Sequence, residues 1–204
     1  MAIYAIGDPH LSLAVNKPMD VFGPRWADHA ARFLQNWEAT VGSDDYVLVP
    51  GDISWGMTLA EALPDLQEID RLPGRKLLIP GNHDYWWQSL KKLRELPLST
   101  ISFIQNDAVV LPEGSVPGVD RRVAVCGTRG WITPGDRTWG EDPAHHDKLY
   151  RREVGRLRRS LEAGRKAGAD AFIVMLHYPP VADDHEPTEF TRLLEEWGGV
   201  LLCV

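Results

Sequence analysis

Short apolar runs alternate with amphipathic segments in the first half of the chain. Three runs have the length and the flanking residues of buried strands: 4–7, 46–49 and 76–79. Three further segments carry apolar side chains at helical spacing: 25–40, 58–70 and 85–96. Thr58 and Glu61 form the pattern of a capping box at the start of the second of these segments. The alternation of strand and helix predicts an α/β fold.

The second half of the chain begins with shorter apolar stretches. They occupy residues 102–105, 108–111 and 122–127. Because Asn-Asp and a Pro/Gly-rich loop separate them, we expect neighbouring antiparallel strands. The pattern then predicts a polar loop, an amphipathic helix, a strand, a second helix and the start of a last strand: 133–147, 148–167, 171–176, 186–197 and 200–204.

Composition narrows the class of protein. The chain has 204 residues, 44% of them hydrophobic and 25% charged, which is typical of a single globular domain spanning residues 1–204. No run approaches the roughly 18 apolar residues of a membrane span, and the N-terminus lacks a signal-peptide pattern. We therefore expect a soluble, cytoplasmic protein with no membrane partner. Cys126 and Cys203 lie in apolar runs and are predicted to be buried, reduced thiols.

The net charge of −7 argues against extended binding of nucleic acid, because such binding normally needs a basic face. The many arginines of the amphipathic helix over 148–167 favour a solvated face over the alternative, a patch that binds nucleic acid.

Polar side chains stand where the apolar runs end. They are Asp8, His10, Asp52, Asn82, His83 and His177. In open α/β folds ligands bind at the carboxyl ends of the strands, so side chains from adjacent strands converge there. Carboxylate oxygens, an amide oxygen and imidazole nitrogens are metal ligands, and an imidazole also exchanges protons. An ordinary turn is the alternative interpretation of residues 79–86, and the repetition of the pattern at the other strand ends favours a site.

Other candidate residues keep two interpretations. Arg129 follows the run 122–127 and is either a guanidinium that faces a phosphate or an ordinary surface arginine. His145 and His146 lie in the polar loop, where solvated histidines are more common than metal ligands. Trp26 and Trp37 fit a helical core pattern. Five other tryptophans lie near the polar turns and are candidates for walls of the site: Trp55, Trp86, Trp87, Trp131 and Trp139.

Four motifs in order resemble the calcineurin-like metallophosphoesterase superfamily. They are Asp8-x-His10, Gly51-Asp52, Gly81-Asn82-His83-Asp84 and His177, and they span nearly the whole chain. The resemblance implies a four-layer α/β/β/α sandwich that binds two divalent metal ions. It assigns Asp8 and His10 to the first ion, Asp52 to both, and Asn82 and His177 to the second. It makes His83, paired with Asp84, the catalytic histidine outside the metal shell.

The resemblance also implies which metal ions and which class of substrate the protein binds. Manganese, iron, zinc or nickel suit these ligands, and the substrate is expected to be a phosphorylated small molecule, either a monoester or a diester. The superfamily's last motif, Gly-His-x-His, is absent, so we expect the natural chain to continue past Val204. Otherwise His145, His146 and His185 are the first candidates to complete the metal shells.

A catalytically weak scaffold or binding protein on the same fold is the alternative function. The acidic charge disfavours a nuclease. Ser54-Trp55, which stands where protein serine/threonine phosphatases carry Asp-Arg, disfavours that branch.

Overall fold

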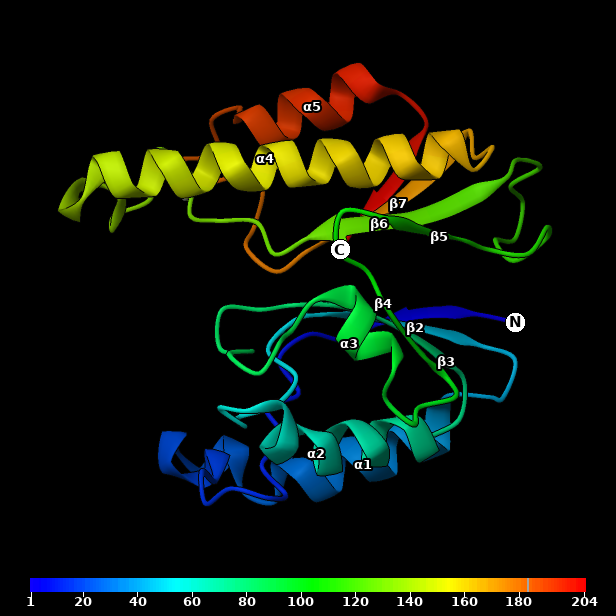
Figure 1. The fold of residues 1–204 in the computed structure, drawn as a ribbon, viewed down its shortest axis with the longest axis vertical. Coiled ribbons are helices and arrows are strands. Elements are labelled where there is room, and N and C mark those ends of the chain that lie inside the picture. The colour runs from blue at the N-terminus through cyan, green and yellow to red at the C-terminus, as the bar shows by residue number, and fades with distance from the viewer. Residues whose placement is uncertain (183) are drawn as a thin grey trace. The chain divides into compact units, whose positions relative to one another are not determined.

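The chain folds into two compact units. The computed structural model describes residues 1–182 and 184–204, and its units are Met1–Phe103 and Ile104–Val204. Each unit contains one four-stranded sheet with helices packed on it (Figure 1). The α/β class predicted from the sequence is confirmed, because the described residues form two sheets and five α-helices.

The first unit is built on a parallel sheet. Its strands lie in the order β1 (Ile3–Ala5), β2 (Tyr46–Pro50), β3 (Arg75–Ile79) and β4 (Ile101–Phe103). Its helices are α1 (His29–Thr40), α2 (Leu59–Arg71) and α3 (Leu90–Arg94), with short 3-10 turns at Met19–Phe22 and Pro24–Trp26. Figure 1 shows α1 and α2 on one face of this sheet. Trp37, Leu66 and Ile69 pack there against Val47 and Val49, so this face carries the core.

The capping box predicted at the start of α2 is confirmed. Thr58 Oγ1 accepts from the backbone N–H of Glu61, and the Glu61 carboxylate accepts from the backbone N–H of Thr58. These bonds satisfy donors that the first turn of a helix leaves without an intrahelical partner.

Two expectations for the first unit are wrong. The helix predicted over 85–96 is confined to α3, because Trp86 turns inward instead and donates its indole N–H to the buried Asp84 carboxylate at 2.9 Å. The stretch predicted to begin antiparallel pairing at 102 is β4, which pairs parallel with β3 and belongs to the first sheet. Short apolar runs specify burial more clearly than strand direction.

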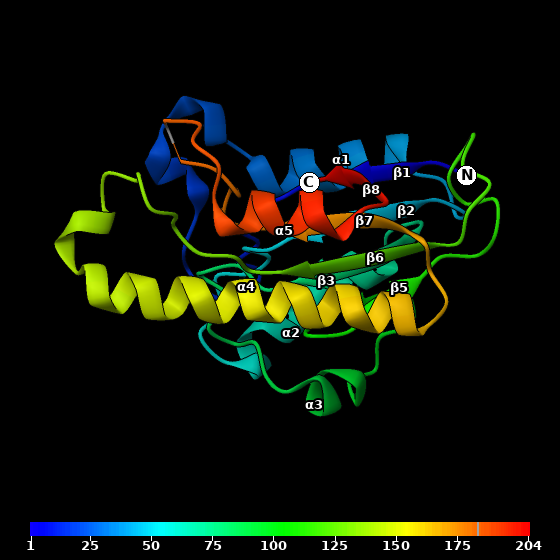
Figure 2. The same ribbon diagram turned by 90° about the horizontal axis from the view of Figure 1, so that it is seen from above.

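The second unit contains a mixed sheet. The order is β5 (Ala108–Val110), β6 (Val123–Thr128), β7 (Ala171–Leu176) and β8 (Val200–Cys203), and only β5 with β6 is antiparallel among these pairs. Figures 1 and 2 show α4 (Pro143–Lys166) and α5 (Glu189–Trp197) side by side on one face of it. A Cβ at Gly164 would lie only 3.0 Å from that of Ala124, which lets α4 approach β6 closely.

The helix α4 begins earlier than the polar composition suggests. Pro143 occupies its first turn, and the Asp142 carboxylate accepts from the backbone N–H of His145 at 3.1 Å. Both features start helices, so His145 and His146 lie on a helix rather than in the predicted loop. A 3-10 turn, Trp139–Glu141, precedes them.

Two further findings concern the helices and the cysteines. Over residues 1–182 and 184–204, none of the helices combines the length and the apolar character needed to span a membrane. Cys126 is fully buried and Cys203 partly buried, and both are free thiols. Burial raises the pKa of the Cys126 thiol to about 12, which keeps it protonated and unreactive.

Candidate metal centre

The loops that leave β1 and β2 run side by side beyond the sheet. The backbone N–H of Asp8 donates to the carbonyl of Gly51 at 3.1 Å, and that of His10 donates to the carbonyl of Asp52 at 2.9 Å. These bonds continue the parallel pairing of the two strands. They bring Asp8, His10 and Asp52 to one edge of the sheet, as predicted from the ends of the apolar runs.

Three of the predicted metal ligands adopt left-handed backbone conformations. Asp8, His10 and Asp52 have φ angles of 55°, 44° and 52°. Residues with a Cβ seldom occupy this region, and each such residue costs on the order of 1 kcal/mol. The cross-loop hydrogen bonds hold these conformations in place, and clusters of such strain are typical of functional sites.

The Asp52 carboxylate lies between two imidazoles. Asp52 is 2% exposed, and its Oδ2 is 2.6 Å from His83 Nδ1 and 3.4 Å from His10 Nε2. Its Oδ1 accepts from the backbone N–H of His83 at 2.8 Å. A Cβ at Gly81 would collide with the Asp52 carboxylate and backbone nitrogen, so only glycine leaves room for this arrangement. The loop after β3 thereby joins the other two loops.

The assembled donors suit a divalent cation. His10, Asp52 and His83 each offer one ligand atom, and these atoms all lie within 4.8 Å of one another. Asp8 Oδ1 is 3.7 Å from His10 Nε2, and the Asn82 amide nitrogen is 3.1 Å from His83 Nδ1. Imidazole and carboxylate ligands without thiolate fit manganese, iron, zinc or nickel. The first unit therefore brings together five of the six predicted residues from the strand ends.

Asp84 has a different role from the expected one. Its Oδ1 accepts from the backbone N–H groups of Ile53 at 2.9 Å and Ser54 at 3.3 Å, and its Oδ2 accepts from that of Gly81 at 2.8 Å. The ring of His83 is instead paired with Asp52, so the expected pairing of His83 with Asp84 is wrong. Asp84 ties the loop after β2 to the loop after β3. Burial raises the pKa of this carboxyl to about 6.

Of the candidate tryptophan walls, Trp55 contacts the site histidines. Its ring stacks on His10 with a centroid distance of 4.4 Å and an interplanar angle of 16°, and it lies 4.8 Å from the His83 ring. Trp86 is fully buried in the core, and Trp87 packs edge-on against Phe103. Their sequence positions next to the site did not separate these roles.

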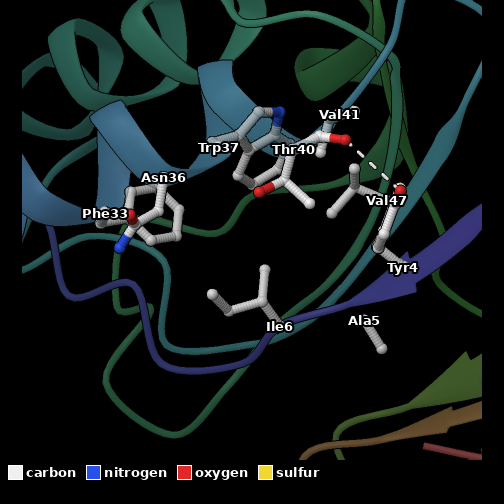
Figure 3. Close-up of a pocket in the computed structure, with 9 residues that line it drawn as sticks. All are labelled: Tyr4, Ala5, Ile6, Phe33, Asn36, Trp37, Thr40, Val41 and Val47. Atoms are coloured by element: carbon white, nitrogen blue, oxygen red, sulfur yellow. Dashed lines mark hydrogen bonds between the residues drawn. The ribbon is translucent and has the colours of Figure 1, made fainter.

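The same unit has an apolar cavity elsewhere. It measures about 220 Å³ and lies between β1 and α1 (Figure 3). Its lining residues are Tyr4, Ala5, Ile6, Phe33, Asn36, Trp37, Thr40, Val41 and Val47. Tyr4 Oη donates to the carbonyl of Thr40 at 3.3 Å across one end. None of the predicted site residues lines it, so its chemistry is separate from that of the candidate centre.

His177 and Arg129 lie in the second unit. His177 directly follows β7, and its backbone N–H donates to the carbonyl of Arg129 at 3.1 Å. The Arg129 guanidinium lies 4.8 Å from the Trp131 ring centroid and 4.0 Å from Glu153 Oε1. Burial lowers the pKa of Arg129, and its side chain is only 22% exposed. This packing argues against the ordinary surface arginine and leaves its contact with phosphate a prediction.

The two adjacent histidines of α4 differ in their surroundings. His145 is exposed, as the solvated interpretation expects. His146 is partly buried, and its Nδ1 accepts from the indole N–H of Trp131 at 3.2 Å. His146 is therefore held by an aromatic neighbour rather than by water alone.

Sequence reasoning missed the buried carboxylate of Glu153. Glu153 is fully buried on α4 and accepts from Thr128 Oγ1 at 2.6 Å and from Arg156 Nη1 at 2.7 Å. The signal was present, because Glu153 falls between Tyr150 and Val154 on the same apolar face of the helix. The sequence predicts a solvated face for the arginines of α4, whereas Arg152 and Arg156 pair with this carboxylate.

Two phage proteins are similar to part of the chain. Gene 66 protein of Mycobacterium phage D29 is 40% identical over 83 residues, which cover 40% of this chain and 40% of that protein. Gene 66 protein of Mycobacterium phage L5 is 46% identical over 57 residues, which cover 28% of this chain and 27% of that protein. The matched part of the chain thus spans less than half the length of either relative.

Two crystal structures are similar over nearly the whole chain. A protein of unknown function, AQ665 from Aquifex aeolicus, has a TM-score of 0.45 and 18% identity, covering 100% of this chain and 89% of the other. Phosphopantetheinyl hydrolase from Mycobacterium tuberculosis has a TM-score of 0.48 and 14% identity, covering 98% and 75%. The sequence model of the family described as calcineurin-like phosphoesterase matches residues 1–204. The chain belongs to the calcineurin-like phosphoesterase family.

Proposed function

We propose that this chain hydrolyses phosphoesters with a dinuclear centre of divalent metal ions. The observation that carries the proposal is the buried Asp52 carboxylate, which lies within reach of two imidazoles and beside the exposed carboxylate of Asp8. A buried carboxylate flanked in this way has ligand atoms close enough to share a cation. Family membership supports phosphoester hydrolysis as the reaction class.

Each residue has a role in the proposal. Following the family resemblance, Asp8 and His10 would hold the first ion, Asp52 would be a ligand of both, and Asn82 would be a ligand of the second. His177 is assigned to the second ion by the family resemblance alone. Bound ions of this kind offset negative charge on the phosphate oxygens and lower the pKa of the attacking water. Manganese, iron, zinc and nickel all suit the donor set.

His83 is proposed as the general acid for the leaving group. Its Nδ1 faces Asp52 at 2.6 Å, and this contact fixes the orientation of the ring. Its side chain is 38% exposed, so the ring is accessible to a substrate from solvent. Because Nδ1 is engaged with the carboxylate, Nε2 is the nitrogen assigned to donate the proton.

The substrate is proposed to be a phosphorylated small molecule, either a monoester or a diester. The net charge of −7 supports this choice over a long nucleic acid. Arg129 is the proposed additional contact for a phosphate oxygen, since a guanidinium binds such oxygens with paired N–H groups.

The test combines metal analysis with a substrate panel. The protein is stripped of metal, reloaded separately with Mn²⁺, Fe²⁺, Zn²⁺ or Ni²⁺, and assayed with nitrophenyl phosphate and bis-nitrophenyl phosphate. We expect two ions per chain and hydrolysis that disappears when metal is removed. A folded protein that binds the ions but hydrolyses neither ester nor natural phosphoesters would overturn the proposal in favour of a binding protein.

A further inference from the structure

Trp55 links the two imidazoles that flank the Asp52 carboxylate. It lies nearly parallel to the His10 ring at 4.4 Å and tilted by 57° to the His83 ring at 4.8 Å. A single indole therefore contacts both rings whose nitrogens face one carboxylate.

The stack restrains the His10 ring. His10 is 8% exposed, and its Nε2 faces Asp52 Oδ2 at 3.4 Å and Asp8 Oδ1 at 3.7 Å. Rotation of the imidazole about its χ2 torsion moves Nε2 away from both carboxylates. An indole stacked on the ring face blocks that rotation, because the turned ring would enter the space of the indole.

Trp55 is itself held from two directions. Its backbone N–H donates to the carbonyl of Leu11 at 2.9 Å, and its indole N–H contacts Met19 Sδ at 3.3 Å. Met19 is 4% exposed and begins the 3-10 turn Met19–Phe22. The Lys17 ammonium also lies 5.5 Å from the Trp55 ring centroid. The indole is therefore fixed by the loop that follows His10, and its position does not depend on a bound substrate.

We propose that Trp55 is a positioning residue of the candidate metal centre. It fixes the ring plane of His10 so that Nε2 is presented to a cation shared with Asp52, and it limits the orientations of His83. This inference rests on the proposed function, because His10 is a ligand only if the metal site exists. The stack of Trp55 on His10 can be measured in protein that does not turn over substrate. Neighbours that orient metal ligands typically change metal affinity on the order of 10- to 100-fold when they are removed.

The experiment compares Trp55→Leu and Trp55→Phe with the control Trp87→Phe. Trp87 lies in the same unit and packs on Trp86 and Phe103, and its buried indole nitrogen has no hydrogen-bond partner among the described residues. The control thus removes one indole without removing a hydrogen bond. Three quantities are measured: the NMR shifts of the His10 ring protons in metal-free protein, Zn²⁺ affinity by competition with a chelating dye, and kcat and KM.

We expect the His10 ring protons to be shifted upfield in the wild type and to lose that shift in Trp55→Leu. The Zn²⁺ dissociation constant should rise about 10-fold or more in Trp55→Leu, less in Trp55→Phe, and not in Trp87→Phe. At saturating Zn²⁺, KM should stay near the wild-type value.

Wild-type Zn²⁺ affinity in Trp55→Leu would overturn the inference. A raised KM with unchanged Zn²⁺ affinity would also overturn it, because Trp55 would then be a substrate contact. A wild type that binds Zn²⁺ and shows the expected losses in Trp55→Leu, but hydrolyses no phosphoester, would refute the proposed function and support this inference.

Discussion

The two units each bury a carboxylate, and the partners of the two carboxylates differ. Asp52 in the first unit is 2% exposed and faces the imidazoles of His10 and His83. Glu153 in the second unit is fully buried and faces the guanidiniums of Arg152 and Arg156 at 3.4 and 2.7 Å. Imidazoles gain and lose charge near neutral pH, whereas guanidiniums stay charged.

This difference separates a site from a structural pair. The arginines already compensate the negative charge of Glu153, so this carboxylate does not need a metal cation to do so. Asp52 is flanked by groups that are themselves metal ligands when neutral, and its neighbour Asp8 is exposed to solvent. Burial alone does not distinguish a candidate metal ligand from a structural carboxylate, whereas the chemistry of the neighbouring side chains does distinguish the two. The predictions below test this distinction.

The largest expected effect is that of Asp52→Asn. The amide removes the negative charge shared by the two proposed ions, which contribute several kcal/mol to catalysis. Metal-dependent hydrolysis should therefore fall by roughly 10³-fold or more. Circular dichroism and metal analysis on the same sample should show a folded, metal-depleted protein. Near-wild-type turnover at saturating Mn²⁺ would contradict the dinuclear assignment.

The second effect is that of His83→Ala. If His83 donates a proton to the leaving group, turnover should fall on the order of 10²- to 10⁴-fold while both metals remain bound. The loss should be smaller for nitrophenyl esters than for alkyl esters, because nitrophenolate needs little protonation. The ligand atom of His83 lies within 4.8 Å of those of His10 and Asp52, so metal content must be measured together with turnover. Metal loss in step with activity would make His83 a ligand.

The sequence predicted the site through strand direction. Asp8, His10 and Asp52 each follow a strand of one parallel sheet, and parallel strands place their carboxyl ends at the same edge. That prediction depends only on the order of the apolar runs. The wrong strand direction expected for β4 and the wrong length of the helix expected over 85–96 therefore do not affect it.

Side-chain partners were harder to predict. Asp84 follows His83 in sequence, yet its carboxylate binds the backbone of Ile53 and Ser54, thirty residues away. Adjacent residues point in different directions in an extended turn, so adjacency is poor evidence for a pair. The family resemblance named the candidate positions but paired His83 with the wrong carboxylate, Asp84 instead of Asp52. Which carboxylate orients the ring depends on the paths of two loops.

A third prediction tests the structural carboxylate. Glu153→Gln leaves partly buried arginines without their carboxylate, and the loss should cost roughly 1–3 kcal/mol, since these guanidiniums retain some exposure to solvent. Urea unfolding measures this change. Metal content should stay at the wild-type level, in contrast to Asp52→Asn. Glu162→Gln, at an exposed position of the same helix, is the matched control and should change stability little.

The smallest expected effect concerns Lys76, a buried cation. Its hydrogen-bond partners are mainly neutral groups, unlike the charged arginines that contact Glu153. Lys76 is fully buried in β3, and its ammonium donates to the carbonyl of Leu72 and to Thr100 Oγ1 at 2.9 Å. Burial lowers the pKa of Lys76 to about 8, below the value of about 10.4 expected in the unfolded chain.

The sign of the pH dependence follows from these two values. Between pH 8 and about 10 the unfolded chain binds more protons at Lys76 than the folded one, so this group makes the unfolding free energy rise with pH. Below pH 8 both states are protonated and the contribution is constant. Urea unfolding at pH 7, 8, 9 and 10 should show a rise of about 1–3 kcal/mol in the wild type relative to Lys76→Met. Lys91→Met, at an exposed position, should keep the wild-type slope. Equal slopes in the wild type and Lys76→Met would contradict this prediction, because they would mean that the buried ammonium has an ordinary pKa. Backbone carbonyls and a hydroxyl would then stabilise the buried charge of Lys76 as well as guanidiniums stabilise that of Glu153.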